Sequence, residues 1–230
     1  MDETIRSASA SRSVVLAGAT GLVGREILQG LLKDDSIAVV HALGRRATDV
    51  RHPRLTSHVV DFAALPSLPP LDEVYLALGT TIKAAGSQAA FRAIDFDASL
   101  AVARAARSAG ARRLGLVSAL GADADSRIFY NRVKGELEDA LEALGYDALV
   151  IARPSLLMGN RKALGQPPRA GELAGMCVNA LLGPLIPASV RAIAASDVAQ
   201  ALLERVPAAK GLEVLSSGSM QGWTRKHGIS

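Results

Sequence analysis

Apolar residues occur in two kinds of run that alternate along most of the chain. Short runs of Val, Ile and Leu lack polar alternation, which is typical of parallel strands buried on both faces. Longer stretches carry apolar residues at helical spacing. Strands are predicted at 13–17, 37–43, 57–61, 73–78, 114–118, 148–152 and 212–215, and helices at 22–33, 88–109, 126–144, 172–182 and 196–205.

The alternation predicts an α/β fold with a doubly wound parallel sheet, because repeated strand–helix–strand units place helices on both faces of one sheet. We expect a single domain over residues 13–215, in which 155–200 forms a small segment on the substrate side. The polar ends of the chain, 1–12 and 216–230, are expected to be flexible.

Composition narrows the class of protein. The 230 residues are 49% hydrophobic, which is enough for a sizeable core, and carry a net charge of +4. The arginines are dispersed and form no basic block with aromatics, so we expect no nucleic-acid partner. A single cysteine, Cys177, suggests a reducing compartment. The polar N-terminus lacks the apolar core of a signal peptide, and residues 176–187 are too short and too interrupted by proline to span a bilayer. These features predict a soluble, cytoplasmic protein with no membrane contact.

A glycine-rich motif, GATGLVG, lies between the first strand and the first helix. In that context Gly18 makes the sharp exit from the strand, Gly21 lets the backbone approach a pyrophosphate, and Gly24 lets the helix pack closely on the sheet. The amino end of the helix supplies partial positive charge. The motif therefore predicts a dinucleotide site formed by Gly18, Thr20, Gly21, Leu22, Val23 and Gly24.

The end of the second strand indicates which dinucleotide is bound. An NAD site usually carries an acidic residue here to bind the ribose 2′-hydroxyl. This chain has Arg45 and Arg46 instead, which suit a 2′-phosphate, although two solvated surface arginines are the alternative. NADP(H) is therefore predicted ahead of NAD(H). Asp61, after the third strand, is a candidate for the adenine amino group or for a local cap.

Small residues follow the fourth strand, where ligands of open α/β sheets bind. The motif LGTT places Leu78, Gly79, Thr80 and Thr81 there, and all four are predicted to contact the cofactor.

Three residues form the predicted catalytic set. Tyr130 and Lys134 stand four apart on one helix face, and Ser118 ends the preceding strand. A phenol is a poor acid or base at neutral pH, but a neighbouring ammonium favours its phenolate form, and a serine can hold a substrate oxygen. A Tyr–Lys pair at this spacing also occurs by chance, so its position after Ser118 carries the argument.

Other kinds of site are not predicted. The histidines have no metal-ligand spacing, and we expect no metal. His41 lies in an apolar run and is expected to be a core histidine, while Cys177 is expected to be a small buried side chain.

These motifs together resemble the atypical short-chain dehydrogenase/reductases, and among them the subgroup of the Tat-interacting protein of 30 kDa. GATGLVG, GRR, LGTT, VSALGAD, YNRVKGE and RPSLLMG occur in the family's order over residues 13–160. The resemblance implies an NADP(H)-binding Rossmann-like domain, Ser-Tyr-Lys roles for Ser118, Tyr130 and Lys134, and a nicotinamide end lined by Pro154, Ser155 and Leu156. The family's fourth catalytic residue is usually an asparagine, and the chain offers only Asp95 and Asp97 nearby.

The leading hypothesis is an NADP(H)-dependent oxidoreductase that acts on a small carbonyl or alcohol substrate. A cofactor-sensing regulatory protein and an epimerase or dehydratase of nucleotide sugars are the alternatives. The sequence leaves open a homodimer or a protein partner.

Overall fold

In the computed structural model, which describes residues 11–158 and 187–226, seven parallel strands form one sheet. Their order is β3-β2-β1-β4-β5-β6-β9. The chain runs outward from β1 to β3, then returns to β4 on the other side of β1, which confirms the predicted doubly wound fold. The strands are β1 (Arg12–Ala17), β2 (Ile37–Gly44), β3 (Leu55–Val59), β4 (Glu73–Leu76), β5 (Arg113–Val117), β6 (Ala148–Arg153) and β9 (Gly211–Ser216).

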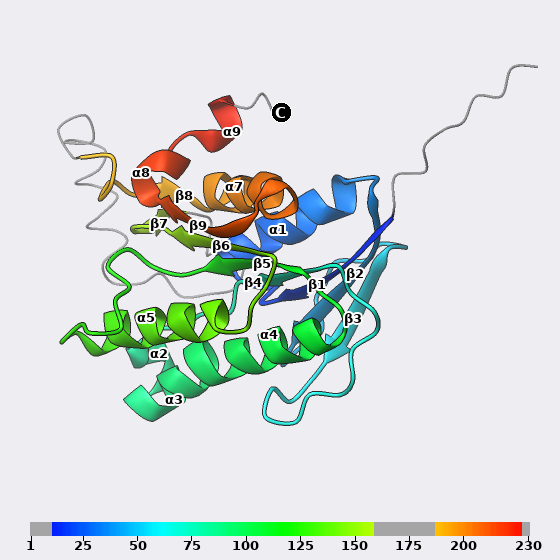
Figure 1. Cartoon of the computed structure of the whole chain (residues 1–230), viewed down its shortest axis with the longest axis horizontal. Helices are drawn as coiled ribbons and strands as arrows, with labels where there is room; N and C mark the ends of the chain where they lie inside the picture. The colour runs from blue at the N-terminus through cyan, green and yellow to red at the C-terminus, as the bar shows by residue number, and fades with distance from the viewer. Residues whose placement is uncertain (1–10, 159–186, 227–230) are drawn as a thin grey trace, which may run out of the picture.

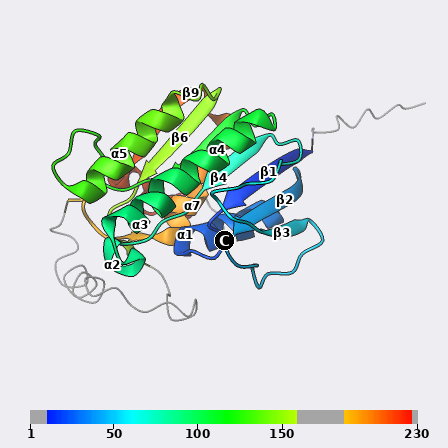
Figure 2. The same cartoon turned by 90° about the horizontal axis from the view of Figure 1, so that it is seen from below.

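Helices cover both faces of this sheet (Figures 1 and 2). On one face lie α1 (Leu22–Lys33) and α7 (Ala195–Ala208), and on the other lie α4 (Ser99–Ser108) and α5 (Phe129–Glu142). Alternate residues of β1 therefore enter different cores: Val14 packs in the core with α1 and α7, and Val15 in the core with α4 and α5. Burial on both faces explains why the strands show no polar alternation.

The stretch predicted as one helix over 88–109 has three parts. It begins with α3 (Gln88–Arg92), where the Ser87 hydroxyl accepts from the backbone N–H of Ala90, continues as the π-helical segment η1 (Ala93–Ala98), and ends as α4. Gly110 follows with a φ of 101°, which favours glycine. Wider π turns often occur at functional sites. A short helix that was not predicted, α2 (Ile82–Ala85), precedes α3.

The ends of the described chain are more ordered than expected. Arg12 opens β1 and its guanidinium bonds Glu73 and Asp34. Residues 216–226, expected to be a flexible tail, form the end of β9 and the helices α8 (Ser217–Met220) and α9 (Trp223–Lys226). They are held because the buried carboxylate of Asp197 accepts hydrogen bonds from the backbone N–H groups of Gly222 and Thr224.

A small parallel pair follows β6. β7 (Leu157–Met158) pairs with β8 (Ile193–Ala194) inside the segment expected on the substrate side. The helix predicted at 172–182 and Cys177 lie outside the described residues. In the two ranges that the structure covers, no helix combines the length and apolar character needed to cross a bilayer.

Candidate active site

The glycine turn between β1 and α1 has no room for side chains at two positions. Gly18 has a φ of 93°, and a Cβ there would lie 2.5 Å from the backbone of Ala77. A Cβ on Gly24 would lie 2.0 Å from the carbonyl oxygen of Gly18. These contacts bring α1, the turn and the end of β4 together, so the turn depends on glycine for packing as well as for backbone conformation.

The amino end of α1 is open to an anion. Gly21 is its N-cap residue, no side chain caps it, and its first turn holds no acidic residue. The unpaired N–H groups of a helix start carry partial positive charge and attract phosphate. The turn therefore fits the pyrophosphate of a dinucleotide.

A cavity of about 380 Å³ opens beside this turn. Nine residues predicted to bind the cofactor line it: Gly18, Thr20, Gly21, Arg45, Arg46, Asp61, Leu78, Gly79 and Thr80. It also includes residues that the sequence analysis missed, namely Thr48, Ser57 and Phe62 near β3, and Ala93, Ile94 and Ala98 from η1. Only the folded chain brings η1 to the glycine turn, so no local sequence signal could have identified these last three.

Other residues that were predicted to bind the cofactor do not line this cavity. Leu22, Val23 and Gly24 belong to the first turn of α1, where Val23 and Gly24 are buried. Thr81 caps α2, because its hydroxyl accepts from the backbone N–H of Ala84.

The polar side chains at the rim of the cavity differ in whether they form hydrogen bonds within the protein. Arg45 and Arg46 are exposed, and no hydrogen bond or ion pair with the described residues engages either guanidinium. Asp61 accepts from the backbone N–H of Ala63, so it does cap the segment that follows it. Asp61 also belongs to the lining of the cavity, and a contact with adenine stays a prediction.

Lys134 is the most constrained member of the predicted catalytic set. Its side chain is only 4% exposed, and its Nζ lies 2.6 Å from Oδ1 of Asp95, itself 1% exposed. Burial lowers the pKa of Lys134, but the carboxylate of Asp95, with Tyr130 and Glu138, more than offsets this, so the net pKa of Lys134 is raised. The lysine is therefore a buried ammonium at neutral pH.

Tyr130 lies one turn before Lys134 on α5 and is partly exposed. Its ring packs against Phe91 of α3, with the ring centroids 5.4 Å apart. Tyr130 is among the groups that raise the pKa of Lys134, and the two residues stand one helical turn apart on α5.

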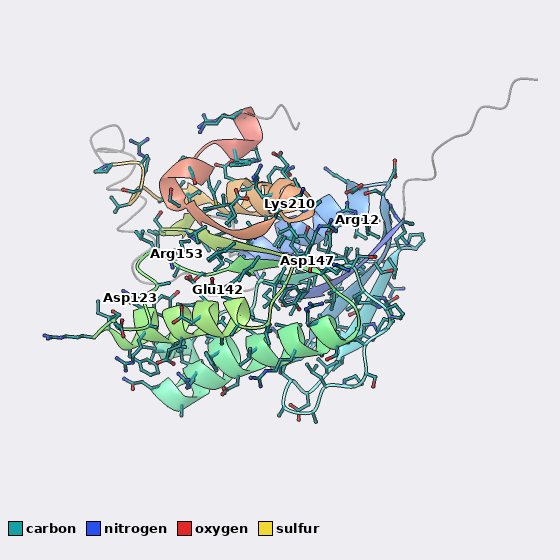
Figure 3. All side chains as sticks on the ribbon, in the orientation of Figure 1. Arg12, Asp123, Glu142, Asp147, Arg153 and Lys210 are labelled. Atoms are coloured by element: carbon teal, nitrogen blue, oxygen red, sulfur yellow. The ribbon has the colours of Figure 1, made fainter. Side chains whose placement is uncertain are left out.

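The hydroxyl of Ser118 is engaged by another residue of the protein. Its hydroxyl donates to the carboxylate of Glu138, which is buried and also pairs with Arg153 at the end of β6. Figure 3 labels Arg153 near α5, at the opposite end of the sheet from Arg12. Glu138 was not predicted; its place one helical turn after Lys134 was the available signal. The structure thus places Ser118 beside α5 but gives its hydroxyl a protein partner.

The nicotinamide-end residues implied by the resemblance follow β6. Pro154 is buried and its carbonyl accepts from the N–H of Leu120, whereas Leu156 is exposed. The Ser155 hydroxyl donates to the carbonyl of Arg191 and accepts from the Ser217 hydroxyl. Ser155 therefore ties the β7–β8 segment to α8.

No cluster of three or more metal-ligating side chains occurs in the parts of the chain that the structure describes. His41, expected in the core, is partly buried and its Nδ1 lies 3.0 Å from Nε2 of His58 on the neighbouring strand.

Comparison with known proteins identifies the family. The NAD(P)H-binding family matches residues 18–167, which include the glycine turn, the cavity and the Tyr130–Lys134 helix. The chain belongs to the NAD(P)H-binding family. Its relatives include the mitochondrial protein fmp52 of Emericella nidulans, 38% identical over 160 residues that cover 65% of this chain and 69% of that protein. The mitochondrial FMP52 of Candida albicans is 36% identical over 158 residues, with 65% and 69% covered.

Solved structures agree on the fold. A UDP-N-acetylglucosamine 4-epimerase from Methanobrevibacter ruminantium, in complex with UDP-N-acetylmuramic acid, superposes with a TM-score of 0.68 at 17% identity, over 90% of this chain and 76% of that one. MoeE5 in complex with UDP-glucose and NAD gives 0.65 at 18% identity, over 88% and 75%. The family makes the protein an NAD(P)H-binding protein, and these neighbours show that it has the same Rossmann-like fold as they do.

One expectation is corrected by these relatives. The chain was expected to be cytoplasmic, but the fungal relatives that it matches are named as mitochondrial proteins. The cytoplasmic expectation was drawn from the polar residues at the start of the sequence, and such residues argue only against a secretory signal, not against import into an organelle.

Proposed function

We propose that the protein is an NADP(H)-dependent oxidoreductase that transfers hydride to or from a small carbonyl or alcohol substrate. The observation that carries the proposal is the buried ammonium of Lys134, which stands one helical turn from the partly exposed phenol of Tyr130. Burying a charged side chain costs free energy unless the charge is paired and hydrogen-bonded, so buried ammonium groups are uncommon outside functional sites. A phenol beside such an ammonium is suited to proton exchange.

The roles follow from the geometry of the site. The glycine turn and the start of α1 would hold the pyrophosphate, and the bound cofactor supplies or accepts hydride. Tyr130 exchanges a proton with the substrate oxygen, and Lys134 stabilises the phenolate. Ser118 was predicted to hold the substrate oxygen, and this stays a prediction because its hydroxyl would first have to leave Glu138.

The preference for NADP(H) is supported by charge. Arg45 and Arg46 lie exposed at the rim of the cavity without a carboxylate partner among the described residues. A guanidinium can bind a 2′-phosphate through two hydrogen bonds, whereas a ribose hydroxyl offers no charge to match. We also propose that the protein is a member of the subgroup of the Tat-interacting protein of 30 kDa. An alternative within the same proposal is a sensor that binds NADP(H) with little turnover.

A second candidate is supported by the solved neighbours, which hold nucleotide sugars. An epimerase would use the same tyrosine and lysine on a UDP-sugar and would regenerate its cofactor in each cycle. An oxidoreductase changes the absorbance of NADPH at 340 nm as the substrate reacts. An epimerase converts UDP-glucose without any net change in that absorbance.

The test has a binding part and an activity part. We expect NADPH at about 100 times its Kd to stabilise the protein by about 2.7 kcal/mol, which raises Tm by about 5–10 °C, and NADH to do less at the same concentration. In a screen of carbonyl and alcohol substrates, Tyr130→Phe should lower turnover by about 10²–10⁴-fold and leave the NADPH-induced rise in Tm intact. Equal stabilisation by NADH would contradict the cofactor preference, and full turnover by Tyr130→Phe would contradict the mechanism.

A further inference from the structure

Arg25 is a partly buried arginine that the proposed function does not use. It follows Gly24 in the first turn of α1, and 28% of its side chain is exposed. Its Nη2 lies 3.3 Å from one carboxylate oxygen of Asp49 and 3.5 Å from the other. Its Nε is buried and has no acceptor among the described residues. The guanidinium thus makes long contacts at one end and leaves a donor unsatisfied at the other.

The contact with Asp49 joins two elements that border the cofactor cavity. On one side α1 begins at the glycine turn, which lines the cavity. On the other side Asp49 belongs to the loop after β2, whose residues Arg45, Arg46 and Thr48 line the cavity. In a Rossmann-like fold the adenosine ribose lies between the glycine turn and the end of the second strand. Arg25 and Asp49 are not part of the lining, so their contact lies at the edge of the place expected for a 2′-phosphate.

The contact between Arg25 and Asp49 is weak. The Asp49 side chain is 70% exposed, and the 3.3 Å between Nη2 and Oδ1 exceeds the roughly 2.7–2.9 Å that is usual for an arginine and a carboxylate. Exposed ion pairs of this kind contribute little to stability. A buried N–H without an acceptor costs free energy, so the guanidinium is poorly satisfied in this position. An anion with more acceptor oxygens would therefore compete with Asp49 for Arg25.

A 2′-phosphate is such an anion. It carries up to two negative charges and three acceptor oxygens, and a guanidinium can bind it through two hydrogen bonds. Arg45 and Arg46 already lie exposed at the rim of the cavity. The carboxylate of Asp49 repels a phosphate bound there, and it can move away from the phosphate only when it leaves Arg25.

We propose that Arg25 is a third arginine of the 2′-phosphate site, and that Asp49 holds its guanidinium until the phosphate displaces the carboxylate. The proposal rests on the proposed function only in taking NADP(H) as the cofactor. Binding exchanges a long contact with an exposed carboxylate for a charged contact with the phosphate. NADH has no group that can take the place of Asp49. The exchange therefore adds to the discrimination between the two cofactors.

Two nucleotides that differ only at the ribose 2′ position test the role of Arg25 in the full chain. Adenosine 2′,5′-bisphosphate carries the phosphate and adenosine 5′-phosphate lacks it, and isothermal titration measures both Kd values without turnover. In Arg25→Gln we expect the Kd for the bisphosphate to rise about 10-fold, the effect of losing one charged hydrogen bond, and the Kd for the 5′-phosphate to stay within about 2-fold. Arg51→Gln is the matched control, since Arg51 is exposed two residues beyond Asp49 and lies off the cavity; it should change neither Kd by more than about 2-fold.

Asp49→Asn should act in the opposite direction. It removes the competing charge and keeps the size of the side chain, so the Kd for the bisphosphate should fall about 3- to 5-fold. Asp35→Asn, fully exposed beyond the other end of α1, is the control and should leave that Kd within about 1.5-fold. In an Arg25→Gln background Asp49→Asn should give a smaller gain, because the guanidinium for which Asp49 competes is gone.

Several results would overturn the proposal. One is an unchanged Kd for the bisphosphate in Arg25→Gln, and another is an equal rise for both nucleotides. A rise in Asp49→Asn would show that the pair only anchors the loop, and an equal fall in both backgrounds would show that Asp49 only repels the phosphate. If Arg25→Gln does not fold, Arg25→Lys keeps the charge without the planar fork and should raise the Kd for the bisphosphate alone, by a smaller factor.

The same titrations separate this proposal from the proposed function. If the unmodified protein binds the bisphosphate no more tightly than the 5′-phosphate, the preference for NADP(H) is rejected. If the unmodified protein prefers the bisphosphate and Arg25→Gln keeps that preference in full, only the role of Arg25 is rejected.

Discussion

The hydroxyl of Ser118 donates a hydrogen bond to the buried carboxylate of Glu138, which is also paired with Arg153. A serine that directly follows β5 and is predicted to face a substrate thus supports an ion pair between a buried carboxylate and a partly exposed guanidinium. A hydroxyl that supports Glu138 contributes to the stability of the fold, whereas a hydroxyl that holds the substrate oxygen contributes to turnover.

Ser118→Ala separates these uses. We expect a loss of about 1–2 kcal/mol in the free energy of unfolding, because a buried carboxylate loses a donor. Urea denaturation measures it. In Glu138→Gln the further effect of Ser118→Ala should shrink, since the two residues interact. A loss in kcat of about 100-fold with unchanged stability would instead assign the hydroxyl to the substrate.

The paired replacement Arg45→Ala/Arg46→Ala tests the phosphate site. We expect the Kd for NADPH to rise about 10- to 100-fold, the loss that follows when one charged hydrogen bond of about 1.5–3 kcal/mol is removed, and the Kd for NADH to change little. Isothermal titration measures both constants. Arg51→Ala is the control, because Arg51 is exposed nearby and lies off the cavity. Equal losses for the two cofactors would contradict a 2′-phosphate contact.

Gly18→Ala tests the packing of the turn. Its φ of 93° disfavours a side chain, and the new Cβ would lie 2.5 Å from Ala77, so we expect a destabilisation of about 3–5 kcal/mol. Gly86 has a similar φ of 88° but open space around the Cβ position, and Gly86→Ala should cost about 1–2 kcal/mol. Thermal unfolding gives both values. Similar losses in the two variants would show that backbone conformation alone fixes the turn.

The histidine pair on β2 and β3 predicts a pH dependence. Burial lowers the pKa of His41, and His58 lowers it further, so the folded protein binds this proton more weakly than the unfolded chain does. The free energy of unfolding is therefore not reduced by this histidine above about pH 6.5, and it declines as the pH falls below that value. Urea midpoints between pH 8 and pH 5 should show this decline. His41→Gln should make the curve flatter below pH 6.5, and an unchanged slope would contradict the assignment.

Local patterns were enough to predict the fold and the glycine turn. Strand and helix periodicity depends on neighbouring residues, and the turn chemistry lies within residues 18–24, so both are visible in the sequence. Contacts between distant segments were not visible. The direction of the Ser118 hydroxyl depends on Glu138, 20 residues away, and the pairing of Lys134 with Asp95 depends on how η1 packs against α5. From the sequence, Asp95 was named only as a nearby carboxylate whose chemistry differs from that of the asparagine usual in the family.

Asp95 pairs with Lys134 and also accepts a hydrogen bond from the backbone N–H of Thr80, and these two contacts have a thermodynamic consequence. Thr80 lines the cavity and Lys134 stands beside Tyr130, so one carboxylate connects the ligand wall to the proton-exchanging helix. A ligand that weakens the hydrogen bond from Thr80 would leave the Asp95 carboxylate with fewer donors and would change how strongly it stabilises the ammonium of Lys134. Because linkage is reciprocal, the protonation state of Lys134 would then alter the affinity for that ligand by the same factor. Cofactor affinity in this protein should therefore vary with pH, even though the carboxylate lies behind the cavity wall.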